Sequence, residues 1–479
     1  MSTLVDLLWI IAPAAEVAWV VAMAVYLVLQ RRSAHATLAW IMAMVFLPLV
    51  GLFVYLLLGP RRYDKHKARR GIALERVNRA TVVDPAAPHD RSPAADYLIR
   101  LCEGAVGLES LARSADVTTY FDGDSAFAAI ERDIGGARHH VHLEYYIWSP
   151  DRLGTRLRDL LCRRAREGVE VRVLVDGVGS FSAGSRFWRP LREAGGQVVV
   201  FNPISPLNLR RRMANFRTHR KIAVIDGTVG FTGGMNVSEH HVAELSGDAA
   251  WRDSHLRLRG PAVKGLQMVF LADWHYAHGE TPQGPPYIPE PGGCPPGAQL
   301  VQVVPSGPDE NRDAIQKLFF SSIAGASDRV LLTTPYFVPD ETMVRSLETA
   351  ALRGADVRVL VPRGGDIRLV AAAARSYYPE LLEQGVRIFE YGPAVLHAKT
   401  LVVDDDLAVV GTANVDNRSF RLNFEVVVAV YQRSVCNELA RVFDRDLARA
   451  EEITLEMTAA EPFSRRLSAA TARLLSPLL

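Results

Sequence analysis

The feature that most constrains the fold of this 479-residue chain is a short polar pattern that opens two apolar strands. In the segments THRKIAVIDG and LHAKTLVVDD, the spacing H-x-K-x-x-x-x-D is formed by His219, Lys221 and Asp226 and again by His397, Lys399 and Asp404. Side chains alternate between the two faces of a strand, so the histidine and the lysine of each copy point the same way. We therefore expect one site built from two halves.

The sequence around the two motifs is duplicated as well. VEVRVLVDG and GGQVVVF in the first half match ADVRVLVPRG and QGVRIFEY in the second. Matched residues also follow each motif at the same offsets: Gly233 and Asn236, Gly411 and Asn414. Short β-rich runs alternate with helical stretches, which is typical of an α/β fold. We predict tandem duplicated β/α domains at residues 96–280 and 299–479, joined by a Gly/Pro-rich connector at 281–298, around a shared central cleft.

Two apolar runs near the N-terminus indicate attachment to a membrane. Ala36–Leu58 is uncharged and long enough to cross a bilayer core of about 30 Å. Leu7–Leu29 is a second candidate, interrupted by Pro13 and by Glu16, and a carboxylate inside a bilayer is costly unless it is neutral or paired. We expect residues 1–60 to form two transmembrane or membrane-associated helices.

The charges that flank these runs predict their orientation. The segment RRYDKHKARR opens a basic linker at residues 61–95, and basic residues next to a membrane span favour the cytoplasmic side. Arg31 and Arg32, between the two runs, compete with this cluster. We expect the linker and everything after it to be cytoplasmic.

Overall charge and cysteine content narrow the class of protein. The formal net charge is +2, whereas a dedicated nucleic-acid binder usually has a clear basic excess. None of the cysteines forms a CxxC pair or a zinc pattern with nearby histidines, which fits a reducing compartment. They are Cys102, Cys162, Cys294 and Cys436.

Together, the two motif copies would bring two imidazoles, two ammonium groups and two carboxamides to one point. Such a cage suits a phosphodiester: one imidazole attacks phosphorus, and the other protonates the departing alkoxide. The lysines and the asparagines Asn236 and Asn414 would bind the non-bridging oxygens. The arrangement needs no metal and no cofactor. The motifs alone do not rank the two histidines as nucleophile.

A nucleophilic imidazole usually needs a carboxylate on its second nitrogen. Asp253 in WRDSH and Glu425 in RLNFEVVVAV are the candidates, because a carboxylate that enters a buried strand needs a partner. The alternative is an ordinary ion pair, such as Arg252 with Asp253. Asp226 and Asp404 complete the motifs, but they have the opposite strand parity and could instead hold the following turn.

The motifs resemble the paired HKD motifs of the phospholipase D superfamily. The sequence is similar to bacterial cardiolipin synthases over essentially the whole chain. The similarity is clear in the segments NFRTHRKIAVIDGTVGFTGGMN, WRDSHLRLRGPAV and LHAKTLVVDDDLAVVGTANVDNRSFRLNFE. The resemblance implies transfer of a phosphatidyl group between two phosphatidylglycerol molecules through a phosphohistidine. It gives His219 a preference as nucleophile and His397 the acid–base role. It also implies a multi-pass protein of the bacterial inner membrane, with anionic lipids as partners.

Other functions use the same cage. A hydrolytic phospholipase D would use water in place of the second lipid, and another phosphatidyltransferase would use a different alcohol. A nuclease would not need the N-terminal apolar runs, and the net charge argues against one. A non-enzymatic scaffold would have no use for both histidines and both lysines. The sequence does not indicate the oligomeric state.

The first half contains an insertion that the second half lacks. This insertion, with the sequence NPISPLNLRRRMANFRT, contains both arginines and apolar residues. The arginines are Arg210, Arg211, Arg212 and Arg217, and the apolar residues include Phe216. This composition fits either a solvated surface loop or a membrane-facing lip that gathers anionic headgroups.

The motif lysines predict activity that survives exhaustive chelation, because the cations that a phosphodiester needs are already present and no His/Cys/Asp cluster has ligand spacing in the sequence. Turnover of the phosphodiester substrate should be measured before and after the protein is treated with a chelator. A strict requirement for an added divalent ion, restored stoichiometrically, would contradict the prediction. A partial effect would not, since divalent ions also alter anionic bilayers.

Overall fold

The computed structural model describes residues 17–29, 34–47, 50–51, 55, 92–107, 110–205, 215–282, 284, 286–289, 297–308, 313–365 and 367–476. The chain divides into two compact units, Met1–Arg62 and Tyr63–Leu479.

The described residues of the N-terminal unit form apolar helical segments. Residues 17–29 are helical, and α2 spans Ala34–Phe46. Large apolar side chains such as Leu29 and Phe46 are 74% and 70% exposed. Within the described ranges, no helix is both long enough and apolar enough to cross a membrane. The predicted runs Leu7–Leu29 and Ala36–Leu58 are only partly described, and the basic cluster that follows them lies outside the described residues.

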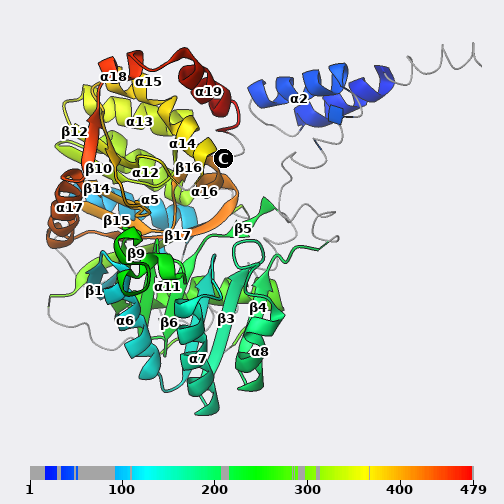
Figure 1. Cartoon of the computed structure of the whole chain (residues 1–479), viewed down its shortest axis with the longest axis vertical. Coiled ribbons are helices and arrows are strands. Elements are labelled where there is room, and N and C mark those ends of the chain that lie inside the picture. Colours follow the sequence, from blue (N-terminus) through cyan, green and yellow to red (C-terminus); the bar gives the residue numbers. More distant parts are fainter. Residues whose placement is uncertain are drawn as a thin grey trace, which may run out of the picture. The chain divides into compact units, whose positions relative to one another are not determined.

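The second unit is organised around one sheet of 16 strands among the described residues (Figure 1). The strands of the first half are β1 (Arg113–Tyr120), β2 (His140–Tyr145), β3 (Glu170–Asp176), β4 (Gln197–Phe201), β5 (Arg217–Thr218), β6 (Lys221–Ile225), β7 (Val229–Gly233) and β8 (His255–Arg259). Those of the second half are β9 (Gln299–Ser306), β10 (Arg329–Thr333), β12 (Asp356–Pro362), β13 (Arg387–Tyr391), β14 (Thr400–Val403), β15 (Leu407–Gly411), β17 (Asn423–Val430) and β18 (Ala450–Ile453). A separate small sheet pairs β11 (Phe337–Val338) with β16 (Val415–Asp416).

The strand order repeats the duplication seen in the sequence. The first half reads β1-β8-β7-β6-β2-β3-β4, and the second reads β9-β17-β15-β14-β10-β12-β13, with β18 added at its edge. In each half the outer strands are parallel and the motif strand, β6 or β14, pairs antiparallel on both sides. The halves join where β1 pairs with β9. They join again where β5, next to the first motif, pairs with β17 of the second half.

Helices cover both halves of the sheet (Figure 1). They are α5 (Pro93–Val106), α6 (Gly123–Gly135), α7 (Arg152–Arg166), α8 (Ser185–Glu193), α10 (Ala243–Ser246), α11 (Val263–His278), α12 (Ala314–Gly325), α13 (Glu341–Leu352), α14 (Arg368–Arg375), α15 (Tyr378–Glu383), α16 (Asn417–Arg421), α17 (Arg433–Leu447), α18 (Leu455–Ala459) and α19 (Phe463–Arg473). Two short 3-10 turns, Glu239–His241 and Gly247–Ala249, follow β7.

The hydrophobic core is shared between the halves. One buried cluster packs helices of the first half on its strands, and another packs helices of the second half, together with α5, on the strands of the second half. A third contains residues of both, among them Ile222 and Val224 of β6 with Val402 of β14. Alternate residues of the motif strands therefore face different cores, as expected of a strand covered on both sides.

The motif aspartates lie at the far end of their strands, away from the motif histidines and lysines. Asp226 follows Lys221 by five residues, a distance of roughly 16 Å along an extended strand. Its carboxylate accepts the backbone N–H groups of Arg138, His139 and His140 at 2.8–2.9 Å, just before β2.

Asp404 accepts the backbone N–H groups of Ser327, Asp328 and Arg329 in the same way, just before β10. Both aspartates have positive φ, 52° and 50°, in the tight turn after the motif strand. These hydrogen bonds support the alternative that both aspartates tie the turn to the neighbouring strand, and a catalytic role for Asp226 and Asp404 stays a prediction.

The arginine-rich insertion is described only at its two ends. Arg210, Arg211 and Arg212 lie outside the described residues. Arg217 is buried, donates to the carbonyl of Asn202 at 2.8 Å and pairs with Asp176 at 3.5 Å. The expectation that the whole insertion forms a solvated loop or a membrane-facing lip is therefore wrong for Arg217.

We predict that Asp226→Ala destabilises the protein by about 2–4 kcal/mol, because three backbone donors lose a charged acceptor. Chemical denaturation of both proteins measures the difference. The matched control is Asp248→Ala, an exposed aspartate that should change the free energy of unfolding by less than about 0.5 kcal/mol. Equal stability of Asp226→Ala and the parent protein would contradict the anchoring role.

Candidate active site

Each motif histidine is positioned by the backbone of the other half. The N–H of His219 donates to the carbonyl of Phe424, in β17, at 2.9 Å. The N–H of His397 donates to the carbonyl of Arg252, just before β8, at 2.7 Å. In the strand order, β17 and β8 occupy equivalent positions in the two halves. The two motifs thus meet across a pseudo-symmetric interface.

The candidate orienting carboxylates lie beside the histidines in a crossed arrangement. Glu425 of the second half is 3.0 Å from Nδ1 of His219 in the first. Asp253 of the first half is 2.7 Å from Nδ1 of His397 in the second. Both carboxylates are fully buried. The alternative partner of Asp253, Arg252, instead forms an ion pair with Asp446 at 2.8 Å.

Each buried carboxylate has further hydrogen-bond donors that hold it in place. Glu425 accepts the hydroxyl of Thr412 at 2.5 Å and the amide of Asn423 at 3.3 Å. Asp253 accepts the backbone N–H of Ser254 at 2.7 Å. A Cβ at Gly234 would lie 2.0 Å from Oδ1 of Asp253, so only glycine leaves room for this carboxylate.

The matched glycines bring the carboxylate-bearing strands close to the motif hairpins. A Cβ at Gly233 would lie 2.5 Å from the carbonyl oxygen of Ser254. A Cβ at Gly411 would lie 2.5 Å from that of Val426. Since real side chains never approach a backbone so closely, glycine at these two positions sets the spacing between the strands.

The electrostatics of the site favour neutral imidazoles. Burial lowers the pKa of His219 and of His397 to about 4 in each case, against the opposing effect of the nearby carboxylates. At neutral pH each ring then donates its Nδ1–H to the carboxylate and keeps a lone pair on Nε2. Their side chains remain 10% and 8% exposed, so a substrate can reach them.

The carboxylates stay ionised despite their burial. Burial alone would raise the pKa of Glu425, but His219 and Lys221 reverse that effect and hold it below its usual value. For Asp253, burial is again outweighed, here by Lys399 and His397, so its pKa is lowered as well.

The motif lysines lie next to the histidines, although the motif strands begin only at Lys221 and at Thr400. Lys221 donates to the carbonyl of His219 at 2.6 Å, and burial lowers its pKa to about 7. Lys399 donates to the carbonyl of His397, and its Nζ also lies 3.0 Å from Nδ1 of that ring. A phosphate that arrived between the lysines would favour their charged forms.

The asparagines predicted to bind phosphate are both buried. Oδ1 of Asn236 accepts the backbone N–H of Ile147 at 3.2 Å, which directs its amide group elsewhere. Oδ1 of Asn414 is buried without a hydrogen-bond partner among the described residues. Phosphate binding by either side chain stays a prediction.

Three aromatic residues beside the histidines were not singled out from the sequence. Tyr146 meets His219 edge-on with ring centroids 5.0 Å apart, and Lys221 lies 5.5 Å from the same ring. Trp251 and His241 lie 5.2 and 5.6 Å from His397. Tyr146 and Trp251 lie within the segments HLEYYIWSPD and WRDSH, and their position in these segments could have identified them as candidate site residues.

The fold also brings together three possible metal ligands that the sequence spacing does not suggest. In the part of the chain that the structure describes, ligand atoms of His241, Asp253 and His397 lie within 4.8 Å of one another. Nε2 of His241 accepts the backbone N–H of Asn236 at 3.2 Å. Nζ of Lys399 is already 3.0 Å from Nδ1 of His397, and its ammonium would repel a cation there. The donor set therefore fits a proton-transfer site better than a metal centre.

Comparison with protein families gives two matches. A family model described as cardiolipin synthase, PLD-like domain, matches residues 130–274 and 319–447. A model described as phospholipase D-nuclease N-terminal matches residues 17–60. The first match covers both motif strands and both carboxylates.

Similar proteins match along nearly the whole chain. A cardiolipin synthase of Geobacillus kaustophilus is 39% identical over 476 residues, covering 96% of this chain and 92% of its own. The major cardiolipin synthase of Bacillus subtilis is 38% identical over 467 residues, covering 94% and 95%. Among solved structures, the phosphatidylserine synthase of Haemophilus influenzae aligns with a TM-score of 0.61 at 14% identity, over 80% of this chain and all of its own, which shows a shared fold.

We predict that Glu425→Gln and Asp253→Asn each lower kcat by roughly 10²–10⁴-fold, because a neutral amide no longer fixes the Nδ1–H tautomer of its histidine. Steady-state turnover of phosphatidylglycerol measures the loss. Glu348→Gln is the matched control: Glu348 is also buried, but it pairs with Arg345 at 2.7 Å. If the site variants fold and turn over like this control, the orienting role is wrong.

Proposed function

The chain belongs to the family of cardiolipin synthases with phospholipase D-like domains, and from that premise we propose that it transfers a phosphatidyl group from one phosphatidylglycerol molecule to another. The products are cardiolipin and glycerol. Relatives named cardiolipin synthase, 38–39% identical over at least 94% of this chain, support the substrate class. The observation that carries the chemistry is the crossed pairing of Glu425 with His219 and of Asp253 with His397.

In the first half-reaction, Nε2 of His219 attacks the phosphorus of a phosphatidylglycerol. A P–N bond forms while the P–O bond to the terminal glycerol breaks, and His397 gives its proton to the departing alkoxide. This needs His397 in its protonated form. The negative phosphodiester beside it raises the otherwise low pKa of the imidazole, so the substrate itself favours that form.

In the second half-reaction, a glycerol hydroxyl of another phosphatidylglycerol loses its proton to His397 and attacks the same phosphorus. The P–N bond to His219 breaks and cardiolipin leaves. Each step regenerates the protonation state that the other requires, so the transfer is reversible. Lys221 and Lys399 stabilise the charge on the non-bridging oxygens in both transition states, with Asn236 and Asn414 as further donors.

The two histidines differ in a way that supports this assignment of roles. Nδ1 of His397 faces both Asp253 and the ammonium of Lys399. Nδ1 of His219 faces Glu425, and no ammonium contact to it is seen among the described residues. The direct contact of Lys399 with Nδ1 of His397 supports giving His219 the role of nucleophile, although both lysines also lower the pKa of His219.

We further propose that the N-terminal unit attaches the enzyme to the bacterial cell membrane, with both halves of the second unit in the cytoplasm. The apolar helical segments at 17–29 and in α2 support attachment, because their large side chains are exposed. The match of residues 17–60 to the phospholipase D-nuclease N-terminal model supports it as well. The basic cluster after these segments supports the cytoplasmic side.

Given phosphatidylglycerol alone, the membrane-reconstituted protein should release cardiolipin and glycerol in equal amounts, and added glycerol should drive the reaction backwards. Lipid product analysis by mass spectrometry tests this. Phosphatidic acid as the main product would instead identify a hydrolase and overturn the proposal.

The same assay tests the shared site. His219→Ala and His397→Ala should each abolish turnover, and the double variant should be scarcely worse than either, because residues that act as one unit are not additive. Near-full activity in either single variant would contradict a site built from both motifs.

A further inference from the structure

Helix α19, near the C-terminus, presents its large apolar side chains away from the protein. Phe463, Leu467 and the capping residue Leu474 are 77%, 54% and 80% exposed, whereas Ala469 and Ala472 are buried. With 3.6 residues per turn, the three exposed residues fall within roughly 40° of one another and lie opposite the alanines. We call Phe463, Leu467 and Leu474 the apolar stripe.

The orientation is the reverse of that in an ordinary surface helix. An amphipathic helix normally packs its large apolar residues inward and exposes polar ones. Here the small alanines hold the helix to the protein, and the side chains of the apolar stripe stay more than half exposed. Met457 of the preceding α18 is 39% exposed and lines a cavity together with Phe463 and Leu467. An exposed patch of this kind marks an interaction site.

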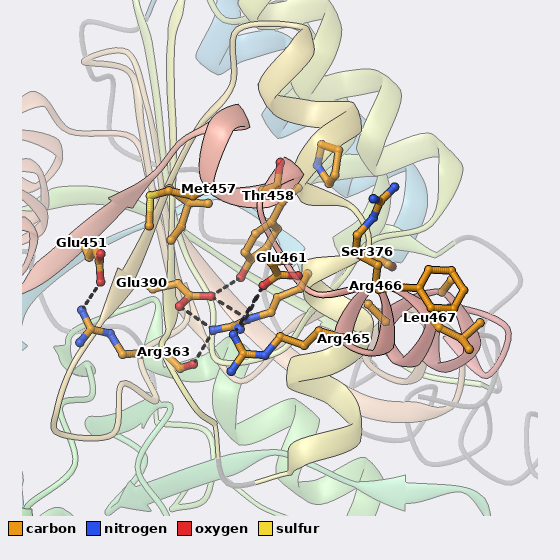
Figure 2. A pocket seen from close by; sticks show the side chains of 17 residues that line it. Arg363, Ser376, Glu390, Glu451, Met457, Thr458, Glu461, Arg465, Arg466 and Leu467 are labelled. Carbon is orange, nitrogen blue, oxygen red and sulfur yellow. Dashed lines mark hydrogen bonds and ion pairs between the residues drawn. The ribbon is translucent and has the colours of Figure 1, made fainter.

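A cavity of about 640 Å³ opens beside the stripe (Figure 2). Phe463 and Leu467 of α19 line it, together with Ile453 of β18 and Met457 of α18. Figure 2 shows Met457 and Leu467 on opposite sides of the space, with Glu461 between them. The apolar surface is therefore hollowed rather than flat.

The acidic groups of this cavity are already paired. Glu390 binds Arg375 at 2.9 Å, Glu451 binds Arg363 at 2.8 Å, and Glu461 lies 3.5 Å from Arg375. These pairs leave no uncompensated acid to repel an anion.

Two arginines of α19, Arg465 and Arg466, also line the cavity. Only Arg466 lies beside the stripe, because Arg465 is about 200° around the helix from Phe463. Arg466 forms no ion pair with any residue that the structure describes, and Arg465 is 65% exposed at 3.9 Å from Glu461. The cavity therefore presents positive charge next to exposed Phe and Leu side chains.

We propose that the apolar stripe of α19 docks into the surface of an anionic phospholipid bilayer, with Arg466 among the headgroups. Phe and Leu on one face, with the basic residue Arg466 at its border, are the composition of helices that lie in a membrane interface. The inference rests on the proposed function, because an enzyme that transfers phosphatidyl groups must meet its substrate at the bilayer.

The shape of the surface favours a bilayer over a second protein molecule. A protein partner would need a complementary protrusion to fill the cavity next to the stripe, whereas fluid acyl chains fill an irregular surface without one. Anionic headgroups also match Arg466 at the border of the stripe, which attracts them as long as it lies within a Debye length of the surface.

The test places an environment-sensitive fluorophore on the stripe of the full-length protein. Ala470→Cys lies on the exposed side of α19, and Glu193→Cys on α8, at the opposite end of the second unit, is the control (Figure 1). Cys294→Ser forms the background, because Cys102, Cys162 and Cys436 are buried. The protein is reconstituted in phosphatidylcholine vesicles with or without phosphatidylglycerol.

We expect brominated lipids to quench the fluorescence of the probe at position 470 but not that of the probe at position 193. Quenching at position 470 should be stronger when the vesicles contain phosphatidylglycerol, and it should be weaker at high salt. Equal access of aqueous iodide to both probes would overturn the proposal. Protection at position 470 that grows with protein concentration and needs no bilayer would also overturn it, since a second copy would then cover the stripe. Neither fluorescence readout depends on turnover, so a failure of bilayer docking can be distinguished from a failure of the proposed enzymatic function.

Activity gives an independent check. The triple variant Phe463→Ser, Leu467→Ser, Leu474→Ser should lose roughly tenfold or more of its turnover on vesicles and keep it on detergent-dispersed phosphatidylglycerol, because only the vesicle assay requires docking. Leu352→Ser, which replaces a 70% exposed leucine of α13, is the matched control. Equal activity of the triple variant and this control on vesicles would contradict the proposal.

Discussion

The structure depends on two carboxylates, Glu425 and Asp253, each of which is buried in one half of the chain and hydrogen-bonded to a histidine of the other. A buried ionised carboxylate without a partner is strongly destabilising, by several kcal/mol. Neither half can therefore bury its carboxylate favourably without the other half. The pairing of β5 with β17 and the glycines at 233 and 411 allow the strands to approach closely enough for these hydrogen bonds.

This arrangement makes the charge of the site depend on the substrate. The imidazoles are neutral when the site is empty, and the pKa of Lys221 is about 7. A phosphodiester then brings the negative charge that the lysines and a protonated His397 require. The same desolvation that keeps the empty site nearly neutral strengthens each interaction with the reacting phosphate. Burial thus serves both the fold and the proposed chemistry.

Much of this organisation could be predicted from the sequence because it is carried by local patterns. Alternation along a strand predicted that His219 and Lys221 lie together, and the repeated segments predicted equivalent halves. The crossing of the carboxylates could not be predicted, because it depends on the order of strands in the sheet rather than on spacing along the chain. The family relationship was recognised from the motifs themselves.

Other features were mistaken or missed for physical reasons. The positions of Asp226 and Asp404 along their strands already indicated that they face away from the histidines. The three backbone hydrogen bonds that each aspartate accepts come from residues at the start of β2 or β10, and the sequence does not show that these residues lie beside the aspartates. Arg217 is buried because Asp176, far away in the sequence, lies beside it. The apolar stripe of α19 is too short to stand out by composition, and only the burial of Ala469 and Ala472 shows which face points outward.

The central claim is that one site, shared by the two halves, works through a phosphatidyl group carried on His219. The most direct test is to quench the enzyme during turnover of phosphatidylglycerol, digest it under conditions that preserve a phosphorus–nitrogen bond, and locate the adduct by mass spectrometry. The account predicts a phosphatidyl group on the peptide that contains His219, and none on the peptide that contains His397. An adduct on His397 with His219 unmodified, or cardiolipin formation without an adduct on either histidine, would contradict it.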